Sequence, residues 1–527
     1  MALRLGALAR SRPGMFYLAL AGIFVIGILA NLLWSWAAPG VKTSSLDLAV
    51  RARLSSPLPD PAILIVDIDE RSLALAAAEH GRWPWPRSVI AETVADLADA
   101  GARAILINLT FSDPDKDHPE DDATFQDVLA HTPNVVLPIT RLNPANDGQS
   151  QIAITRFAGA QIRDSAAAAR PIAVLAPAFT AAYGRLGFNN LPVDSDGAVR
   201  RFDPWQNETA FAFPSLPLRA LEVGAIPTNI KADSFPNGML LNWRNKRGDY
   251  ARASFADVAA DLASGDAKRA ARYRGKLIIM GATAVGLGSV KGTPAAAITD
   301  DNTILATAMD DMKSGSWLRP IPDWATALLS ALSVLGLAAT FIFRMEQRWI
   351  NRLFWGLQSG FILVTIYCVS YTPWLLDISS TILFATSYFA IANIYSRIHL
   401  YALRGNPAFS DFVQFHKGGP FLLVGVKGGA KRRVHVMVRR MERRFGVRNV
   451  LHLDNLFDSG HMLQPVTAGL SFVVIASENS ATARIAAEEI AQACQLTPRL
   501  VEVRAETDPR DVRPIFKAVL GAAIDMA

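Results

Sequence analysis

The sequence predicts an exported α/β domain, four transmembrane helices and a small cytoplasmic α/β domain. Three observations support this fold class. Four long runs carry almost no charge, at residues 15–38, 324–343, 353–371 and 374–395. A strand–helix–strand pattern follows the first run, and a second alternation of strands and helices fills residues 406–527. The 527 residues also exceed one compact core, since a domain usually holds about 50–250 residues.

The composition fits a protein that is part membrane-embedded and part soluble. Hydrophobic residues make up 51% of the chain and charged residues 19%, a lower charged share than soluble domains usually show. The net charge of +6 is modest, and basic residues that flank membrane spans account for much of it, so it does not indicate nucleic-acid binding. The two cysteines, Cys368 and Cys494, lie far apart in sequence, which gives no support to a disulfide framework.

The first apolar run is expected to be an uncleaved signal anchor. Residues 1–14 contain three arginines and no acid, and are expected in the cytoplasm. Residues 15–38 are long enough to cross a hydrocarbon core of about 30 Å. A cleaved signal peptide is the alternative, because Ala37 and Ala38 resemble a cleavage site. Its apolar region is usually only about 7–15 residues long, however.

The three late runs set the expected topology. The joint between the second and third runs carries Arg344, Arg348 and Arg352, whereas the joint between the third and fourth is only Thr-Pro. Because Lys and Arg favour cytoplasmic loops, residues 39–321 are expected outside and residues 406–527 inside. Buried core helices are the alternative for these runs, but three of them separated by such short joints favour membrane spans.

The exported segment begins with an apolar strand at Ile63–Val66, which runs into three acidic residues. A helical stripe at Ser88–Ala100 and a second buried strand at Ala104–Leu109 follow. A strand–helix–strand unit favours a right-handed crossover within an α/β sheet. Further strands are expected at residues 135–139, 173–176, 239–243 and 276–280.

Six sequence blocks between residues 45 and 318 occur in a recognisable order. They are IVDIDERSL, GRWPWPR, GARAILINLTF, GFNNLPVDSDGAVRRF, LLNWR and RGKLIIMGATAVGLGSVKGTP. The segment resembles the CHASE-type-two domain, the second class of cyclase- and histidine-kinase-associated extracellular sensory modules. The resemblance implies a multi-pass sensor in the bacterial inner membrane, with an extracytoplasmic ligand or envelope protein as its signal, a homodimer and no cofactor. In relatives, the region after the last span is usually a nucleotide cyclase, a diguanylate-cyclase-type domain or a protein kinase.

Three carboxylates follow the opening strand and are ligand-binding candidates: Asp67, Asp69 and Glu70. The ends of parallel strands commonly bind ligands, and strand alternation would turn Asp67 and Asp69 to one side. Hard divalent cations prefer such oxygen ligands. The structural alternative is that one carboxylate caps the next helix, which typically stabilises it by about 1 kcal/mol, while another pairs with Arg82 or Arg87.

Two further groups complete the ligand-binding candidates. Trp83, Trp85 and Arg87 would form an aromatic and cationic wall for a small molecule, although the intervening prolines would equally fix the tryptophans in the core. Thr283 lies in a Gly-rich turn after a strand, where backbone N–H groups can bind an anion. This turn lacks the Lys-Ser/Thr of a P-loop. The histidines give no zinc-site spacing, and no catalytic residue is assigned.

The C-terminal region is predicted to be an α/β domain whose element order is ferredoxin-like, a layout shared with cyclase cores. Strands are expected at residues 421–426, 449–453, 471–476 and 499–504, and helices at residues 433–445, 481–494 and 509–523. Two-metal chemistry needs paired carboxylates, but the first strand has none, and Asp454 and Asp458 have no evident partner. Kinase motifs are also missing. A non-catalytic signalling domain is therefore expected; a divergent cyclase-like enzyme and a membrane scaffold are the alternatives.

One helix of this region is strongly basic. Its candidate contact residues are Arg439, Arg440, Arg443 and Arg444. An apolar stripe runs along the opposite face, so the helix is amphipathic. A basic face beside a membrane attracts anionic lipid headgroups, and an acidic cytoplasmic partner is the other binding candidate. A plain solvated face is the structural alternative.

Overall fold

The computed structural model describes residues 12–34, 39–244, 248–343, 345–403, 411–412, 415–416, 420–427, 431–453, 470–477, 479–504 and 521. The chain forms two compact units. The larger comprises residues 21–337 and 346–385, and the smaller comprises residues 1–20, 338–345 and 386–527. The predicted helix at residues 509–523, apart from residue 521, lies outside the described residues, as do Asp454 and Asp458.

A seven-stranded sheet forms the centre of the larger unit. Its strands are β11 (Ala251–Ser254), β1 (Ile63–Ile68), β12 (Leu277–Ala282), β2 (Ala104–Asn108) and β3 (Val135–Arg141), in that spatial order, with β5 (Val174–Leu175) and β6 (Leu186–Phe188) both paired to β3. All pairings are parallel except that of β3 with β5. The predicted α/β sheet is therefore confirmed.

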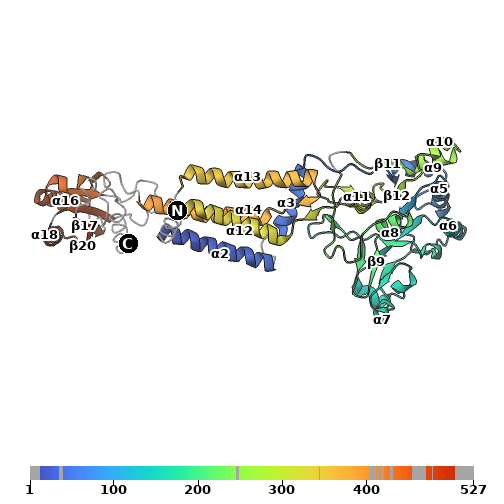
Figure 1. Cartoon of the computed structure of the whole chain (residues 1–527), viewed down its shortest axis with the longest axis horizontal. Coiled ribbons are helices and arrows are strands. Elements are labelled where there is room, and N and C mark those ends of the chain that lie inside the picture. Colours follow the sequence, from blue (N-terminus) through green and yellow to red (C-terminus); the bar gives the residue numbers. More distant parts are fainter. Residues whose placement is uncertain are drawn as a thin grey trace. The chain divides into compact units, whose positions relative to one another are not determined.

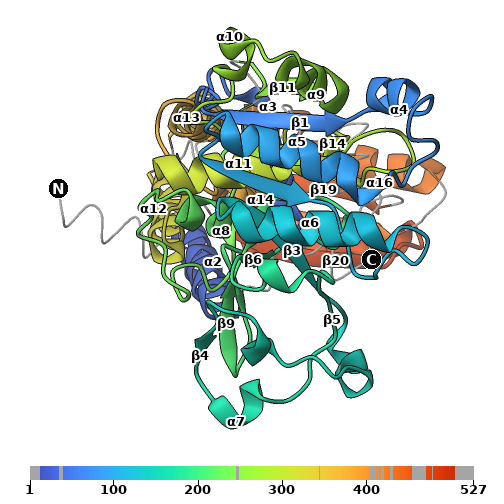
Figure 2. The ribbon, with the colours of Figure 1, turned by 90° about the vertical axis from the view of Figure 1, so that its right-hand side faces the viewer.

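Helices cover both faces of this sheet, and strand alternation explains how. On β1, Leu64 and Val66 pack with one set of helices, α5 (Arg87–Asp99), α6 (Pro119–His131) and α9 (Phe255–Ala263). Ile63 and Ile65 pack with the other set, α8 (Leu216–Val223) and α11 (Asp301–Ser314). Figure 2 shows α5 and α6 lying across one face. Apolar residues on both faces are the pattern expected of buried parallel strands.

Smaller elements complete this unit. The helices are α3 (Pro39–Ala52), α4 (Glu70–Ala76), α7 (Ser165–Ala168) and α10 (Ala267–Ala270). The strands are β4 (Gln161–Ile162), β7 (Arg201–Phe202), β8 (Trp205–Asn207), β9 (Phe211–Pro214), β10 (Met239–Leu240), β13 (Val290–Lys291) and β14 (Thr299–Asp300). The strand expected at residues 239–243 is the short β10, which pairs with β7 rather than with the central sheet.

Four long helices carry the apolar runs (Figure 1): α2 (Arg12–Trp34), α12 (Asp323–Ile342), α13 (Gln347–Tyr371) and α14 (Ser379–Leu403). Among the described residues, three helical segments are long and apolar enough to cross a membrane, Gly14–Trp34, Asp323–Ile342 and Gln347–Tyr371. Three of the four predicted spans are thus supported. The fourth run contains several Ser, Thr, Asn and Tyr residues, which lower the hydropathy of α14.

The start of α14 also differs from the prediction. Trp374–Leu375 forms strand β16, which pairs in parallel with β15 (Arg319–Pro320). Asp377 accepts hydrogen bonds from the backbone N–H of Ser379 at 2.9 Å and from its hydroxyl. An Asp at this position caps a helix, so α14 begins at Ser379 rather than at Trp374.

The smaller unit contains a four-stranded antiparallel sheet in the order β18-β19-β17-β20. The strands are β17 (Pro420–Lys427), β18 (Val450–Leu453), β19 (Leu470–Ala476) and β20 (Pro498–Arg504), and the helices are α16 (Lys431–Phe445) and α18 (Ser480–Ala493). Val434, Met437 and Met441 of α16 pack with Ala483 and Ala487 of α18 in one apolar core. The described elements agree closely with those predicted.

Candidate functional site

The carboxyl ends of the parallel strands meet at one edge of the central sheet, as predicted. In the strand register, Gly281 of β12 lies between Asp67 of β1 and Asn108 of β2. A Cβ atom on Gly281 would lie 2.4 Å from Asn302 Oδ1, so only glycine allows α11 to approach so closely. Asn108 Nδ2 donates to Asn302 Oδ1 at 3.1 Å, and Asn189 Nδ2 donates to Asn108 Oδ1 at 3.2 Å.

Asp67 is held by an arginine that the sequence analysis did not single out. Arg252 Nε and Nη2 donate to the two Asp67 oxygens at 2.7 and 2.8 Å. The remaining Arg252 nitrogen, Nη1, donates to Asp300 Oδ2 at 3.1 Å and to Thr303 Oγ1 at 2.9 Å. Burial alone would raise the pKa of Asp300, but hydrogen bonding to Arg252 and its charge lower it overall. This bidentate pairing satisfies both oxygens of Asp67 and favours a structural role over a cation site.

The other two carboxylates also fulfil structural roles. Asp69 caps α4: its Oδ1 accepts from the Ser72 backbone N–H, the Ser72 hydroxyl and the Ser254 hydroxyl, at 2.7–2.8 Å. Burial would raise the pKa of Asp69, but these hydrogen bonds lower it overall. Glu70 Oε1 accepts from the Val285 backbone N–H at 2.9 Å, which lowers its pKa. Helix capping, the structural alternative, is therefore confirmed for Asp69.

A cavity of about 610 Å³ lies beside this sheet edge and brings together three predicted residues, Trp83, Trp85 and Arg87. It is also lined by residues that follow β2, among them Asp113 and Lys116, and by Leu287 after β12. Its volume lies within the range of about 300–1,000 Å³ that is usual for small-molecule sites. Asp67, Asp69, Glu70 and Thr283 do not line it.

The two tryptophans line the cavity while packing against the core. Trp85 is 3% exposed, and its ring lies 5.0 Å from that of Trp83 and 5.6 Å from that of Phe255. Its indole Nε1 is buried without a hydrogen-bond partner among the described residues. A buried indole N–H usually has a partner, so Trp85 is an exception to the usual pattern.

Arg87 is already held by the protein. It forms an ion pair with Asp122 and donates to the carbonyl oxygen of Asp113. Its guanidinium also lies over the rings of Phe111 and Phe179, at 5.6 and 5.4 Å from their centroids. Arg87 therefore shapes the cavity wall and fixes the loop after β2, and its partner is Asp122 rather than one of the three carboxylates after β1.

Thr283 lies in the Gly-rich turn after β12, away from this cavity. Its backbone N–H donates to the carbonyl oxygen of Ile68 at 3.0 Å, so the donor of the predicted anion site is used within the fold. Among the described residues, His118, Glu120 and Asp121 form a group whose spacing would suit a metal ion, but all three lie on the outer surface of α6 and its approach. Exposed acidic groups of this kind are common without a metal.

The four candidate arginines of α16 are all exposed: Arg439, Arg440, Arg443 and Arg444. None of them forms an ion pair with a described residue. The opposite face is buried through Val434, Val438 and Met441, which confirms the predicted amphipathic pattern. The smaller unit thus exposes four arginines on one face of α16.

Comparison with known proteins gives one result. A family model described as the CHASE2 domain matches residues 18–340. This range takes in most of α2, the whole central sheet with its helices, and most of α12. No curated protein and no solved structure matches the chain.

Proposed function

The chain belongs to the CHASE2 family, and we propose that it is a multi-pass sensor of the bacterial inner membrane. In this proposal an extracytoplasmic signal acts on the central α/β domain, and the spans carry the change to a cytoplasmic output domain. The family match and the three span-capable helices support a sensor role for a membrane protein. The alternation of basic and apolar segments supports the orientation.

The observation that carries the relay is the pairing of β15 with β16. The Arg319 N–H donates to the Pro373 oxygen at 2.7 Å, and the Ile321 N–H donates to the Leu375 oxygen at 2.9 Å. On its other side this segment is tied to the sensory fold, because the Leu318 N–H donates to the Leu240 oxygen at 3.0 Å. A shift in the domain would therefore reach the connection between α13 and α14 directly, rather than only along α12.

This relay is tested by removing one hydrogen-bond donor. Ile321→Pro deletes the N–H that bonds Leu375, whereas Ile321→Val keeps it. Hydrogen exchange is measured on the full-length protein in nanodiscs, with and without a compound that raises its Tm in a screen of small solutes. We expect ligand-dependent exchange in α13 and α14 for the parent and Ile321→Val, and its loss in Ile321→Pro. Undiminished transmission in Ile321→Pro would contradict the relay.

We propose that the cavity beside the sheet edge receives the signal, in the form of a small molecule or a side chain of an envelope protein. The tryptophan wall supports a flat ligand that packs against the indole rings. A ligand at 100 times its Kd adds about 2.7 kcal/mol to the free energy of unfolding. Trp83→Leu should abolish the Tm increase caused by such a compound, and Trp34→Leu, in α2, should not.

We propose further that the output domain is non-catalytic and ferredoxin-like, in a homodimeric protein. The strand order β18-β19-β17-β20 supports that fold, and the acid-free strand β17 supports the lack of catalysis. The same strand order favours the second candidate, a divergent nucleotide cyclase. Purified protein incubated with ATP or GTP and Mg²⁺ or Mn²⁺ separates the two, since formation of a cyclic nucleotide would refute the non-catalytic proposal.

A further inference from the structure

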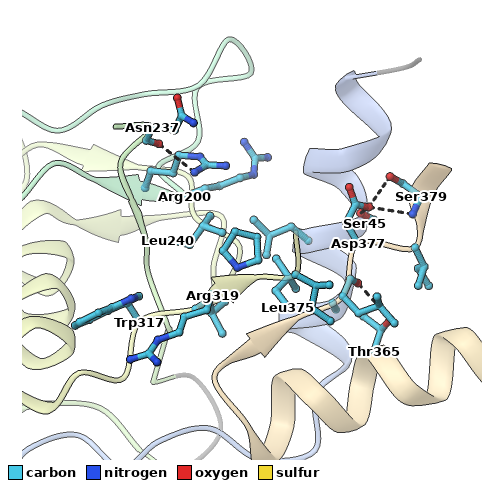
Figure 3. A pocket seen from close by; sticks show the side chains of 18 of the residues that line it. Ser45, Arg200, Asn237, Leu240, Trp317, Arg319, Thr365, Leu375, Asp377 and Ser379 are labelled. Atoms are coloured by element: carbon cyan, nitrogen blue, oxygen red, sulfur yellow. Dashed lines mark hydrogen bonds between the residues drawn. The ribbon is translucent and has the colours of Figure 1, made fainter. Parts of the chain in front are cut away.

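A second and larger cavity, of about 960 Å³, lies in the larger unit between the base of the sensory fold and its spans. Figure 3 shows Arg200, Asn237 and Trp317 on one side of it, and Thr365, Asp377 and Ser379 on the other. Its walls come from α3, the loop around Asn237, the β15–β16 pair, α13 and the first turn of α14. Most of its lining is apolar, as in sites that bury a hydrophobic ligand.

Apolar residues line both sides of the cavity. Ile362 and Ile366 contribute from α13, and Ile382 contributes from α14. Beside α13, α3 presents Leu48, which is 67% exposed. An apolar surface that opens beside a membrane span suits an acyl chain better than a water-soluble ligand.

The positive charge of this cavity belongs to the domain side, and it comes from three arginines. The guanidinium donors of Arg200 are already used, because Arg200 forms ion pairs with Asp47, Asp194 and Asp196. Its charge and that of Asp194, which also lines the cavity, are therefore compensated within the fold.

Arg201 and Arg319 bond only backbone oxygens. Arg201 Nη1 donates to the Asn237 oxygen at 3.0 Å and to the Gly238 oxygen at 3.5 Å. Arg319 Nη2 donates to the Gly315 oxygen at 3.4 Å, and its guanidinium lies 5.1 Å from the ring centroid of Trp317. Asp203 interacts with Arg201 only through its charge, without an ion-pair contact, and Arg319 forms no ion pair with a described carboxylate. Both arginines therefore retain N–H donors for an anion.

The two remaining acids in the lining serve helix starts on the span side. Asp377 accepts from the Ser379 N–H at 2.9 Å and from the Ser45 hydroxyl at 3.5 Å. Asp323 lies in the first turn of α12, where a negative charge is favourable. The acids on the span side thus lie at helix starts, whereas the open arginine donors lie on the domain side.

We propose that this cavity binds an anionic amphiphile, with its acyl chain along Ile362 and Ile366 and its charged head at Arg201 and Arg319. An acyl chain matches the apolar lining, and a carboxylate or phosphate matches the open guanidinium donors. The cavity also borders the β15–β16 pair, so its occupant contacts the relay. This assignment is independent of the cavity beside the sheet edge and of what binds there.

Trp317 provides the measurement. The full-length protein in nanodiscs of zwitterionic phosphatidylcholine is titrated with a brominated fatty acid, brominated phosphatidylglycerol or brominated phosphatidylcholine. Bromine quenches tryptophan fluorescence at short range, and the signal of Trp317 is the difference between the parent and Trp317→Phe. Saturable quenching is expected for the two anionic probes. The stronger of them identifies whether a free acid or a phospholipid is the occupant.

Two pairs of variants test the two ends of the cavity. Arg201→Gln combined with Arg319→Gln should lower the binding affinity of the anionic probe about tenfold or more. Hydrogen bonds to charged groups are stronger than those between neutral groups. Arg272→Gln, an exposed arginine elsewhere, should leave its affinity unchanged. Ile362→Phe narrows the apolar end without adding a second tryptophan signal and should reduce quenching. Leu363→Phe, its neighbour on α13 that does not line the cavity, should preserve quenching.

Three outcomes would overturn the proposal. Equal quenching by zwitterionic and anionic probes, unaffected by Arg201→Gln with Arg319→Gln, would show that the arginines select no headgroup. Unchanged quenching in Ile362→Phe would show that the chain lies elsewhere. If no probe quenches Trp317 and native mass spectrometry shows a dimer, the cavity is assigned to a second copy of the chain, which refutes the amphiphile.

Discussion

At the scale of single residues, the sheet edge depends on Arg252, which ties β11 to both β1 and α11. Its side chain is only 35% exposed, and its partners Asp67 and Asp300 are 10% and 21% exposed. Removing it would leave two largely buried carboxylates without a counter-charge, which is more costly than the loss of the pair itself. Asp67 and Asp69, which the sequence suggested as ligand contacts, instead stabilise this edge of the sheet through hydrogen bonds.

The Arg252 network gives a stability prediction. Arg252→Met should lower the free energy of unfolding by about 2 kcal/mol, because charged hydrogen bonds to buried acids are lost. Urea unfolding of the full-length protein in detergent, followed by tryptophan fluorescence, measures the change. Arg71→Met is the matched control, since its pair with Asp257 is exposed and such pairs contribute about 0–1 kcal/mol. Similar losses in the two variants would contradict the assigned role.

The pKa of Asp300 gives a pH prediction. Because its pKa is lowered in the folded state, the unfolded chain binds a proton more readily, so stability rises with pH in this range. The contribution is fully present above the unfolded pKa of about 3.9 and is lost as the pH falls through the folded pKa. The Tm of the parent should therefore fall more steeply below about pH 4 than that of Asp300→Asn. Parallel Tm curves would count against this linkage.

At the scale of elements, α16 is the clearest amphipathic helix in the described chain, with its basic face open. Val436, 42% exposed on α16, suits a fluorophore once changed to Cys in a variant without Cys368 and Cys494. We expect a blue shift in anionic nanodiscs, since each basic residue near such a surface contributes about 1 kcal/mol. Changing Arg439, Arg440, Arg443 and Arg444 to Gln should remove it.

The control for α16 lies on the neighbouring helix. Ile485 of α18 is 60% exposed, and a fluorophore there should show no shift that depends on lipid charge. Added salt should weaken the shift at position 436, because screening shortens the reach of surface charges. A blue shift of equal size after the four substitutions would contradict lipid binding by these arginines and favour a plain solvated face.

The elements that could be predicted from sequence are those with a local cause. The apolar run of β1, the stripe of α5 and the two faces of α16 are visible within a short window, and all three form as expected. Strand β11 has the sequence Ala-Arg-Ala-Ser, without an apolar pattern, and it is a strand because it pairs with β1. The sequence of β16 predicts the start of a span, but in the structure it pairs with Arg319–Pro320.

The site was predictable only in part, for the same reason. The sequence places Trp83, Trp85 and Arg87 together because they are neighbours in the chain, and all three line the cavity. The partner of Asp67 is 185 residues away, and no local pattern connects them. Which carboxylate remains free for a ligand is therefore decided by tertiary pairing and cannot be read from strand ends alone.

At the scale of the whole molecule, the family assignment and the apolar helices support a sensor role for a membrane protein, and the proposed orientation can be tested. Alkaline phosphatase, which is active only outside the cytoplasm, should be active when fused after Ser264 and inactive when fused after residue 405. Green fluorescent protein at the same two positions should give the opposite result. The expected pattern follows from the bias of Lys and Arg toward cytoplasmic loops. Phosphatase activity at residue 405 would reverse the proposed topology.

The β15–β16 pair has an energetic consequence for the proposed relay. It spans only two residues of each strand, and Pro320 has no N–H to extend the ladder. The hydrogen bonds from Arg319 and Ile321 are among the few that hold it. At about 1 kcal/mol each, a few such bonds alone would leave the pair open in roughly 1% of molecules. A signal molecule that binds the open state about a hundredfold more tightly would then make the two states equally populated.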